Sequence, residues 1–209
     1  MKRFTLITEA DARLLEPGTT VVLAPGGQVT PLAADTLRAR RVTVAASVPD
    51  VAESALAPEA DPRTLAIGSD HGGVALKTAL VAHLRGQGRT VIDVGTDGPD
   101  PVDYPDIAGQ VAKLVARHEA GAGIVIDGAG LGSAIAANKI DGVRAAMCTD
   151  RTLARYAREH NGANVLALGA TLVSTADALA IVDTFIGTPT REPRYLRRLA
   201  KIAALERLG

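Results

Sequence analysis

Short runs of apolar residues alternate along the chain with longer segments in which apolar positions recur every three or four residues. From Thr64 onward, five apolar runs are bounded by Gly, Asp or Asn, and they comprise TLAIGS, TVIDVG, AGIVID, VRAAMC and NVLALG. They are continuously apolar rather than alternating, as in strands that are buried on both faces. The pattern therefore predicts five strands of one parallel sheet.

The segments between these runs have the periodicity of amphipathic helices. Leu76, Leu80 and Leu84 fall on one face of a predicted helix that ends near Gly86. A second segment, YPDIAGQVAKLVARHEA, repeats the pattern. Helices that alternate with buried parallel strands predict a three-layer α/β/α sandwich with a five-stranded, Rossmann-like sheet.

The chain before this sandwich predicts a smaller α/β unit. In residues 1–46, two further β-branched runs surround a helix for which Thr30 is the predicted N-cap and Pro31 the first residue. Residues 47–63 are rich in Ala, Pro and acidic residues and lack helical periodicity, which is typical of a linker. The predicted main domain comprises residues 64–209.

Composition narrows the classes of function. Lys and Arg total 23 and Asp and Glu total 23, without a basic stripe carrying aromatic residues, so a nucleic-acid partner is not expected. The single cysteine, Cys148, excludes an intrachain disulfide and a cysteine-built metal site. No apolar run reaches the roughly 20 residues of a membrane span, and the N-terminus lacks the features of a signal peptide. A cytoplasmic protein without a membrane partner is expected.

The clearest candidate for chemistry is the stretch IVIDGAGLGSAIAANK, residues 124–139. It predicts a buried strand, a glycine-rich turn and the start of a helix, with Asp127 where the strand stops. The glycines permit a tight turn whose N–H groups can face an anion, although such turns also serve only packing. The third glycine of the dinucleotide fingerprint is missing, so an NAD cofactor is not expected.

Other polar residues at the ends of predicted elements are weaker candidates. Asp70 and His71 follow the first strand of the main domain, and His160 precedes the last. Each is also consistent with a solvated loop residue. Arg194 and Arg198 lie at the start of the last predicted helix. The face that they share either binds a phosphate or is simply a solvated charged face.

Seven segments occur in one order over about residues 64–205: IGSDHGG, DVGT, VDYPDIA, GAGLGSAIAANK, GVRAA, REHNGANVLALGA and IVDTFIGT. Together they resemble the ribose-5-phosphate isomerase B family of sugar-phosphate isomerases, which includes the galactose-6-phosphate isomerase subunits. The resemblance implies isomerisation of a small aldose phosphate, such as ribose 5-phosphate, to the ketose through an enediolate. It further implies a homodimer whose active sites are built from both subunits, without metal or nucleotide.

The resemblance also implies catalytic roles. The reaction needs a base, donors to the enediolate oxygen and an acid/base group that opens the sugar ring. Many family members have a cysteine thiolate as base where this chain has Asp127, and others use a Glu where it has Ser133. Asp127 is then the one ionisable residue of the loop that can take the proton, since Cys148 lies outside it. The alternative is that Asp127 only accepts N–H bonds at the turn. His160 matches the ring-opening histidine, and His71 matches a catalytic position at the end of the first strand.

Substrate contacts implied by the resemblance come from strand ends, the glycine-rich loop and the last helix. They are Asp70, Tyr104, Gly128, Ala129, Gly130, Gly132, Ser133, Asn161, Arg194 and Arg198. The two arginines match a phosphate clamp that reaches in from the partner subunit.

Three residues depart from the family pattern. Ala129 stands in place of Thr or Ser, Thr171 in place of an Arg that helps to bind phosphate, and Tyr195 in place of a His. Fewer donors weaken the binding of a phosphate. Two alternatives therefore stay open: isomerisation of a different sugar or sugar acid, and a degenerate module that binds or assembles without catalysis.

Residues 1–46 lie outside the isomerase pattern. Their sequence ITEADARLL, followed by PGGQVTPLAADTLRARRVTV, resembles a segment of proteins associated with bacterial microcompartments. This resemblance implies a docking segment and a place inside a microcompartment. A chain that begins near Pro62 is then expected to be a soluble, active dimer.

Overall fold

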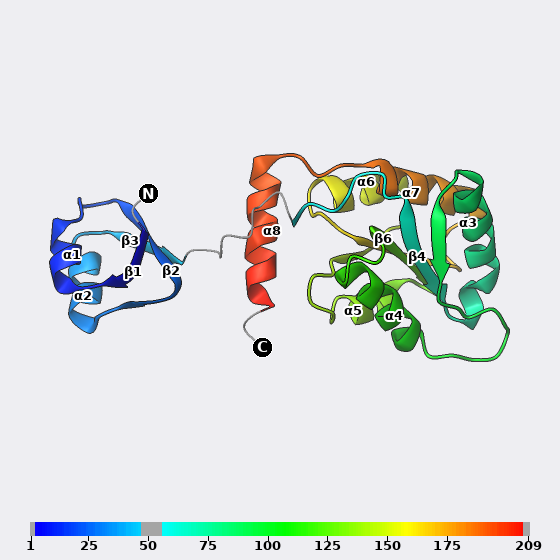
Figure 1. Ribbon diagram of the computed structural model, residues 1–209, viewed down its shortest axis with the longest axis horizontal. Coiled ribbons are helices and arrows are strands. Elements are labelled where there is room, and N and C mark those ends of the chain that lie inside the picture. The colour runs from blue at the N-terminus through cyan, green and yellow to red at the C-terminus, as the bar shows by residue number, and fades with distance from the viewer. Residues whose placement is uncertain (1–2, 47–55, 207–209) are drawn as a thin grey trace. The chain divides into compact units, whose positions relative to one another are not determined.

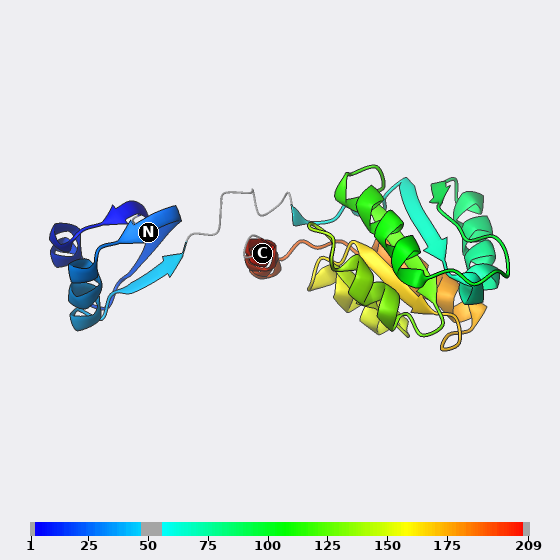
Figure 2. The ribbon, with the colours of Figure 1, turned by 90° about the horizontal axis from the view of Figure 1, so that it is seen from below.

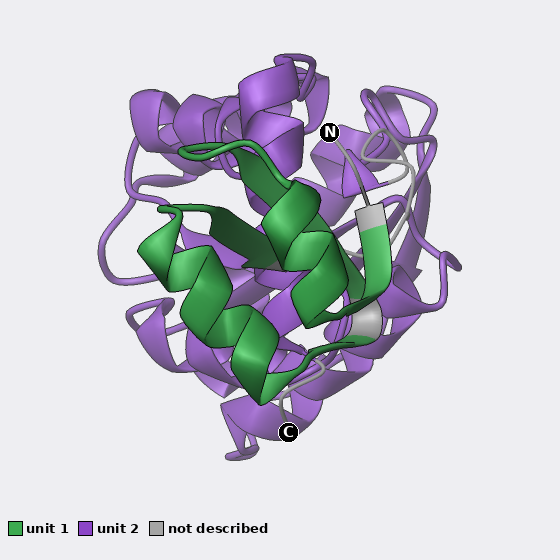
Figure 3. Ribbon diagram, turned by 90° about the vertical axis from the view of Figure 1, so that its left-hand side faces the viewer, with its two compact units in different colours: residues 1–51 green, residues 52–209 purple. Residues whose placement is uncertain are grey.

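The computed structural model describes residues 3–46 and 56–206. The chain divides into two compact units, residues 1–51 and residues 52–209, which are green and purple in Figure 3. Each unit has its own sheet and its own hydrophobic core.

The N-terminal unit is a three-stranded parallel sheet with two helices. Its elements are β1 (Arg3–Ile7), α1 (Glu9–Leu14), β2 (Thr20–Val29), α2 (Pro31–Ala39) and β3 (Thr43–Ala46), and the strand order is β1-β2-β3. The hydroxyl of Thr30 accepts the N–H of Ala33 (3.4 Å) and Pro31 occupies the first turn of α2, as the sequence predicts. A single core of strand and helix residues closes the unit: Ile7, Ala12, Leu15, Val21, Ala33, Leu37 and Val42.

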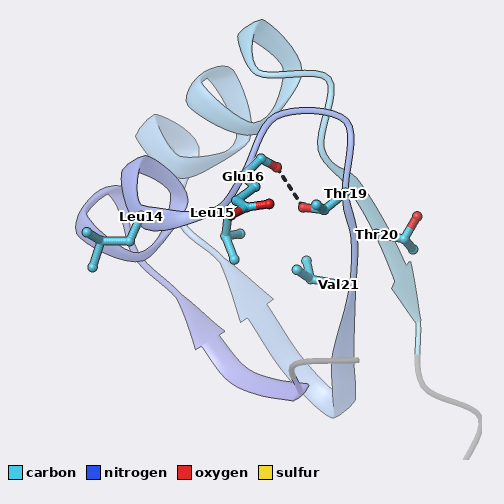
Figure 4. Close-up of a pocket in the computed structure, with 6 residues that line it drawn as sticks. All are labelled: Leu14, Leu15, Glu16, Thr19, Thr20 and Val21. Carbon is cyan, nitrogen blue, oxygen red and sulfur yellow. Dashed lines mark hydrogen bonds between the residues drawn. The ribbon is translucent and has the colours of Figure 1, made fainter.

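A pocket of about 370 Å³ lies between the end of α1 and the start of β2. Figure 4 shows the residues that line it, Leu14, Leu15, Glu16, Thr19, Thr20 and Val21, with the Thr19 hydroxyl donating to the Glu16 carbonyl (2.7 Å). All predicted site residues belong to the second unit, so this pocket is not the predicted active site.

The second unit contains the predicted five-stranded parallel sheet, in the order β5-β4-β6-β8-β7. Its elements are β4 (Thr64–Ser69), the short 3-10 helix η2 (His71–Gly73), α3 (Val74–Gly86), β5 (Thr90–Asp93), α4 (Tyr104–Ala116), β6 (Ala122–Asp127), α5 (Leu131–Ala137), β7 (Ala145–Met147), α6 (Arg151–Glu159), β8 (Val165–Gly169), α7 (Thr175–Gly187) and α8 (Pro193–Leu205). None of the described helices has the length and apolar character to cross a membrane.

Two layers of helices cover the sheet, which confirms the α/β/α sandwich. Helices α3, α6 and α7 pack on one face, and α4 and α5 pack on the other (Figure 1). The central strand β6 is buried along its whole length because neighbouring residues face opposite layers. Ile124 belongs to the core under α3, α6 and α7, and Val125 belongs to the core under α4 and α5. Helix α8 lies outside both layers (Figure 2).

The second half of the predicted linker is held against the second unit. The guanidinium of Arg144 donates to the carbonyl of Leu56 (2.9 Å), and that of Arg158 donates to the carbonyl of Glu59. Arg158 is fully buried, and burial lowers its pKa to about 10, with a further contribution from Arg144. Residues 47–55 of the predicted linker lie outside the described residues.

These contacts predict different stabilities for two truncated chains. Removal of residues 1–46 leaves both carbonyl acceptors in place, whereas removal of residues 1–61 takes them away from Arg144 and Arg158. A hydrogen bond to a charged group contributes about 1.5–3 kcal/mol. Since 1 kcal/mol shifts the melting temperature by about 2–4 °C at this size, the shorter chain should melt at least about 6 °C lower. Equal melting temperatures in calorimetry would show that residues 56–61 do not stabilise the unit.

Candidate active site

The carboxyl ends of β4 and β6 meet at one edge of the sheet. The two strands are parallel neighbours, Ser69 pairs with Ile126, and the N–H of Asp70 donates to the carbonyl of Ile126 (3.0 Å). Neighbouring strands are about 5 Å apart, so Asp70 and Asp127 leave the sheet side by side. This edge is where ligands bind in open parallel sheets.

The glycine-rich loop closes around the carboxylate of Asp127. Oδ1 accepts the N–H groups of Ala129 (2.8 Å) and Gly130, and Oδ2 accepts the N–H of Ser133 (2.8 Å). Gly130 adopts a left-handed conformation (φ 77°), which lets the chain fold back over the carboxylate. Asp127 is 5% exposed. The N–H groups of the loop therefore bind a carboxylate of the chain itself, that of Asp127.

The environment of Asp127 keeps it ionised. Burial on its own raises the pKa of Asp127, but hydrogen bonds from the side chain and N–H of Ser133 and from the N–H groups of Gly130 and Ala129 outweigh it. The net pKa lies below the ordinary value of an aspartate.

Residues from three further elements hold the loop. The ring of Tyr104, at the start of α4, lies directly against Gly132, where an added Cβ would come within 2.5 Å of it. After β8, the Thr171 hydroxyl donates to the carbonyl of Gly128 (2.7 Å). Gly169 approaches Ala129 so closely that a Cβ would meet its carbonyl at 2.7 Å. Thr171 thus anchors the loop.

Asp70 and His71 form the rim of this edge. The Asp70 carboxylate accepts the N–H of Gly73 (3.1 Å) and caps η2. The side chain of His71 is exposed. Together with Asp127, Tyr104 and the loop, these residues form one cluster, hereafter the loop cluster.

His160 belongs to a second cluster, at the end of α6. Its ring stacks on Tyr156 (centroids 4.7 Å apart) and lies against Tyr195 of α8 (4.6 Å). The guanidinium groups of Arg194 and Arg198 lie 4.6 Å and 5.7 Å from the Tyr195 ring centroid. We call these five residues, with the exposed Asn161 that follows His160, the histidine cluster.

The two clusters lie at opposite edges of the sheet. Helix α6 begins at the carboxyl end of β7 and returns to the start of β8, so His160 is at the amino edge, whereas Asp127 ends β6 at the carboxyl edge. A five-residue strand such as β8 spans roughly 16 Å. One subunit therefore cannot place His160 and Asp127 on the same small sugar.

Sequence reasoning missed the stacking of Tyr156 on His160. The signal was available, because the two residues are four apart in a predicted helix and therefore share a face. The chain has only three tyrosines, and two of them contact this histidine.

Two further features were compared with these clusters: groups of possible metal ligands among the described residues, and a second pocket. Within residues 3–46 and 56–206, no group of three or more His, Cys, Asp or Glu side chains is placed to hold a metal. A pocket of about 410 Å³ near the starts of α6 and α7 contains none of the predicted site residues. It is lined by Thr149, Asp150, Arg151, Thr152, Asp177 and Ile181.

Cys148 is expected to be chemically inert. It is 1% exposed, and burial, with the nearby Asp150 charge, raises the pKa of its thiol to about 12. The thiolate that reacts with alkylating agents is therefore scarce at neutral pH. Cys148→Ser should leave kcat unchanged, because the thiol is buried and lies outside the glycine-rich loop that holds Asp127. Rapid inactivation of the wild-type protein by iodoacetamide, with protection by substrate, would contradict this assignment.

Comparison with known proteins identifies the second unit. A family model described as Ribose/Galactose Isomerase matches residues 65–202, well over half of the chain. The chain belongs to this family. Ribose-5-phosphate isomerase B of Escherichia coli is 43% identical over 144 residues, which cover 69% of this chain and 97% of that protein. The isomerase B of Mycolicibacterium paratuberculosis is 41% identical over 143 residues, covering 68% and 90%.

Solved isomerase B structures have the same fold as this family member. The Clostridium thermocellum enzyme superposes with a TM-score of 0.68 at 48% identity, covering 69% of this chain and 98% of that one. A Mycoplasma genitalium structure with bound ribulose-5-phosphate has a TM-score of 0.68 at 37% identity, covering 70% and 97%. The family match begins at Leu65, so it does not extend to the N-terminal unit.

Proposed function

We propose that the protein is an aldose–ketose isomerase that interconverts ribose 5-phosphate and ribulose 5-phosphate through an enediolate. The observation that carries this proposal is the 43% identity to ribose-5-phosphate isomerase B across 97% of the Escherichia coli enzyme. The related structure with bound ribulose-5-phosphate supports the same substrate class. No cofactor is required, because the reaction only moves protons within the sugar.

Asp127 is the proposed base. Its carboxylate takes the proton from C2 of the open-chain aldose and returns it to C1. Its lowered pKa makes it ionised but weakly basic. A bound sugar excludes water, and this desolvation moves the pKa upward. Leu131 and Gly132 are the first two residues of α5, so their N–H groups have no acceptor inside the helix. These N–H groups can donate to the enediolate oxygens.

The remaining groups open the ring and bind the phosphate. His160 is the proposed acid/base that opens the furanose, and Arg194 and Arg198 are the proposed phosphate ligands. The two arginines are four residues apart on α8 and are both exposed, so they can bind one phosphate together. Asp70 and His71 contact the sugar hydroxyls at the rim.

We further propose a homodimer in which each site combines the loop cluster of one subunit with the histidine cluster of the other. The support is the placement of Asp127 and His160 at opposite edges of one sheet. A twofold-symmetric dimer that brings the carboxyl edge of one subunit against the amino edge of the other also makes the reciprocal contact, and so forms two equal sites.

A different sugar is the second candidate substrate. Two observations favour it: Ala129 has no hydroxyl, and Thr171 binds the Gly128 carbonyl where the family has an arginine. A panel of four- to six-carbon aldose phosphates and sugar acids decides between the two, since kcat/KM should be highest for ribose 5-phosphate. A preference of at least about tenfold for another member would move the assignment to that sugar.

The N-terminal unit is proposed to dock the enzyme to a bacterial microcompartment. Its separate core and its position outside the family match support an added function. The enzyme then acts in the cytoplasm or within such a compartment. Removal of residues 1–46 should abolish co-purification with microcompartment shells and leave kcat unchanged, and retained co-purification would overturn the docking role.

A further inference from the structure

We infer that Tyr156 is a positioning residue for His160, which it holds against Tyr195 in the orientation that opens the sugar ring. The inference rests on the proposed isomerase function and extends it to residues without an assigned role. Two of the chain's three tyrosines contact this one histidine.

Two aromatic rings contact the imidazole of His160. Tyr156 stacks on it with an interplanar angle of 16°, and Tyr195 lies against it at 36°. The N–H of His160 also donates to the carbonyl of Tyr156 (3.0 Å), so the backbone of the two residues is one helical turn. The torsion that rotates a histidine ring is otherwise broad. The two tyrosines limit this rotation, and the His160 side chain stays 33% exposed.

The second tyrosine is fixed by its own contacts. Tyr195 is 7% exposed, and its hydroxyl accepts a hydrogen bond from Arg194 (2.8 Å). Leu199, one turn further along α8, packs where a Cβ on Gly162 would lie, 2.5 Å from its Cδ1. Gly162 (φ 55°) therefore lets α8 approach the end of α6 closely. Tyr195 is therefore held in place by its neighbours, and the imidazole of His160 contacts both Tyr195 and Tyr156.

This arrangement joins two steps of the proposed reaction. Arg194 and Arg198 lie over the face of Tyr195, within the range of cation–π attraction. The groups that bind the phosphate and the group that opens the ring therefore form one rigid assembly. A sugar held by its phosphate meets His160 at a set distance and angle.

Tyr156→Leu tests the inference, because it keeps an apolar helical residue and removes the stacked ring. Tyr156 is 42% exposed, so the substitution leaves the core intact. We expect kcat for ribose 5-phosphate to fall about tenfold, part of the 10²–10⁴ that a placed acid/base contributes, with KM within about twofold. Tyr156→Phe restores the ring without the hydroxyl and should recover the wild-type rate.

Proton exchange separates positioning from general damage. Ribulose 5-phosphate cannot form a furanose, because its O5 carries the phosphate, so exchange of its C1 proton with D2O needs the base but no ring opening. Exchange by Tyr156→Leu should stay within about twofold of the wild type while conversion of ribose 5-phosphate falls. Tyr195→Phe, which removes the acceptor of Arg194 but keeps the ring, should instead raise KM and leave kcat unchanged.

Three results would overturn the inference. One is an unchanged kcat in Tyr156→Leu, and another is an equal loss of conversion and exchange, which indicates a structural role. The third is a Tyr156→Phe variant as slow as Tyr156→Leu. A wild-type protein that converts no sugar and exchanges no proton refutes the proposed function itself, and the inference with it.

Discussion

Asp127→Asn is expected to lower kcat by at least about 100-fold, within the range for removal of a general base. Asparagine is nearly isosteric but cannot accept the proton. Its Oδ1 can keep the N–H bonds of Ala129 and Gly130, while its amide faces the N–H of Ser133, which loses its acceptor. The measurement is steady-state turnover of ribose 5-phosphate, with calorimetry to show that the variant is folded.

The matched control is Asp127→Cys, which installs the base of many family members. Its activity should exceed that of the asparagine variant by at least about tenfold, and it should become sensitive to iodoacetamide. The kcat/KM of the wild type, which reports the free enzyme, should not depend on the ionisation of Asp127 above about pH 5, because the pKa of Asp127 is lowered. The kcat/KM of the cysteine variant should instead rise as pH rises toward about 8.5. If the pH profile is the same in the wild type and in Asp127→Cys, Asp127 is not the base and only accepts N–H bonds at the turn. The same conclusion holds if Asp127→Asn keeps more than about a tenth of wild-type kcat, a loss below 1.4 kcal/mol.

The second large effect is the recovery of activity when two inactive subunits combine. Dimers of Asp127→Asn alone and of His160→Asn alone should each be at least about 100-fold slower than the wild type. In a mixed dimer, one site combines the intact Asp127 of one subunit with the intact His160 of the other, and the second site carries both substitutions. Mixed dimers isolated by two affinity tags should therefore show about half of wild-type activity.

The alternative predicts no recovery. If each subunit carried a complete site, every site in a mixed dimer would hold one substitution, and its activity would match the mean of the parents. A dimer of two differently tagged Asp127→Asn subunits controls for the effect of tagging. An inactive mixed dimer would contradict the shared site.

The parallel sheet could be predicted from the sequence because buried parallel strands are continuously apolar. β6 and β8 are buried at every position, and both were found as apolar runs. β7 is only Ala145–Met147, shorter than its predicted run, because it is an edge strand that pairs with β8 alone. Local pattern cannot show where an edge strand stops pairing, since pairing depends on its neighbour.

Residues of a candidate site could be proposed from the sequence, but their geometry could not. The motif around Asp127 indicates a loop that can bind an anion, yet only the structure shows that the carboxylate itself receives three N–H groups of the loop. Likewise, the order of the segments along the chain does not show that His160 and Asp127 lie at opposite edges of the sheet. This separation follows from the direction of α6, which ends at the start of β8. The ring of Tyr156 stacks on that of His160, but Tyr156 lies outside the segment REHNGANVLALGA that carries the family resemblance.

The most direct test of the central claim is the conversion of ribose 5-phosphate by the full-length protein in D2O, followed by NMR. The account predicts ribulose 5-phosphate with solvent deuterium at C1, because the proton that leaves C2 exchanges on the base before it returns to the enediolate. The Asp127→Asn variant should show neither product nor deuterium above a hundredth or so of the wild-type rate. Conversion without any deuterium, or no conversion by the folded wild-type protein, would contradict isomerisation through an enediolate at Asp127.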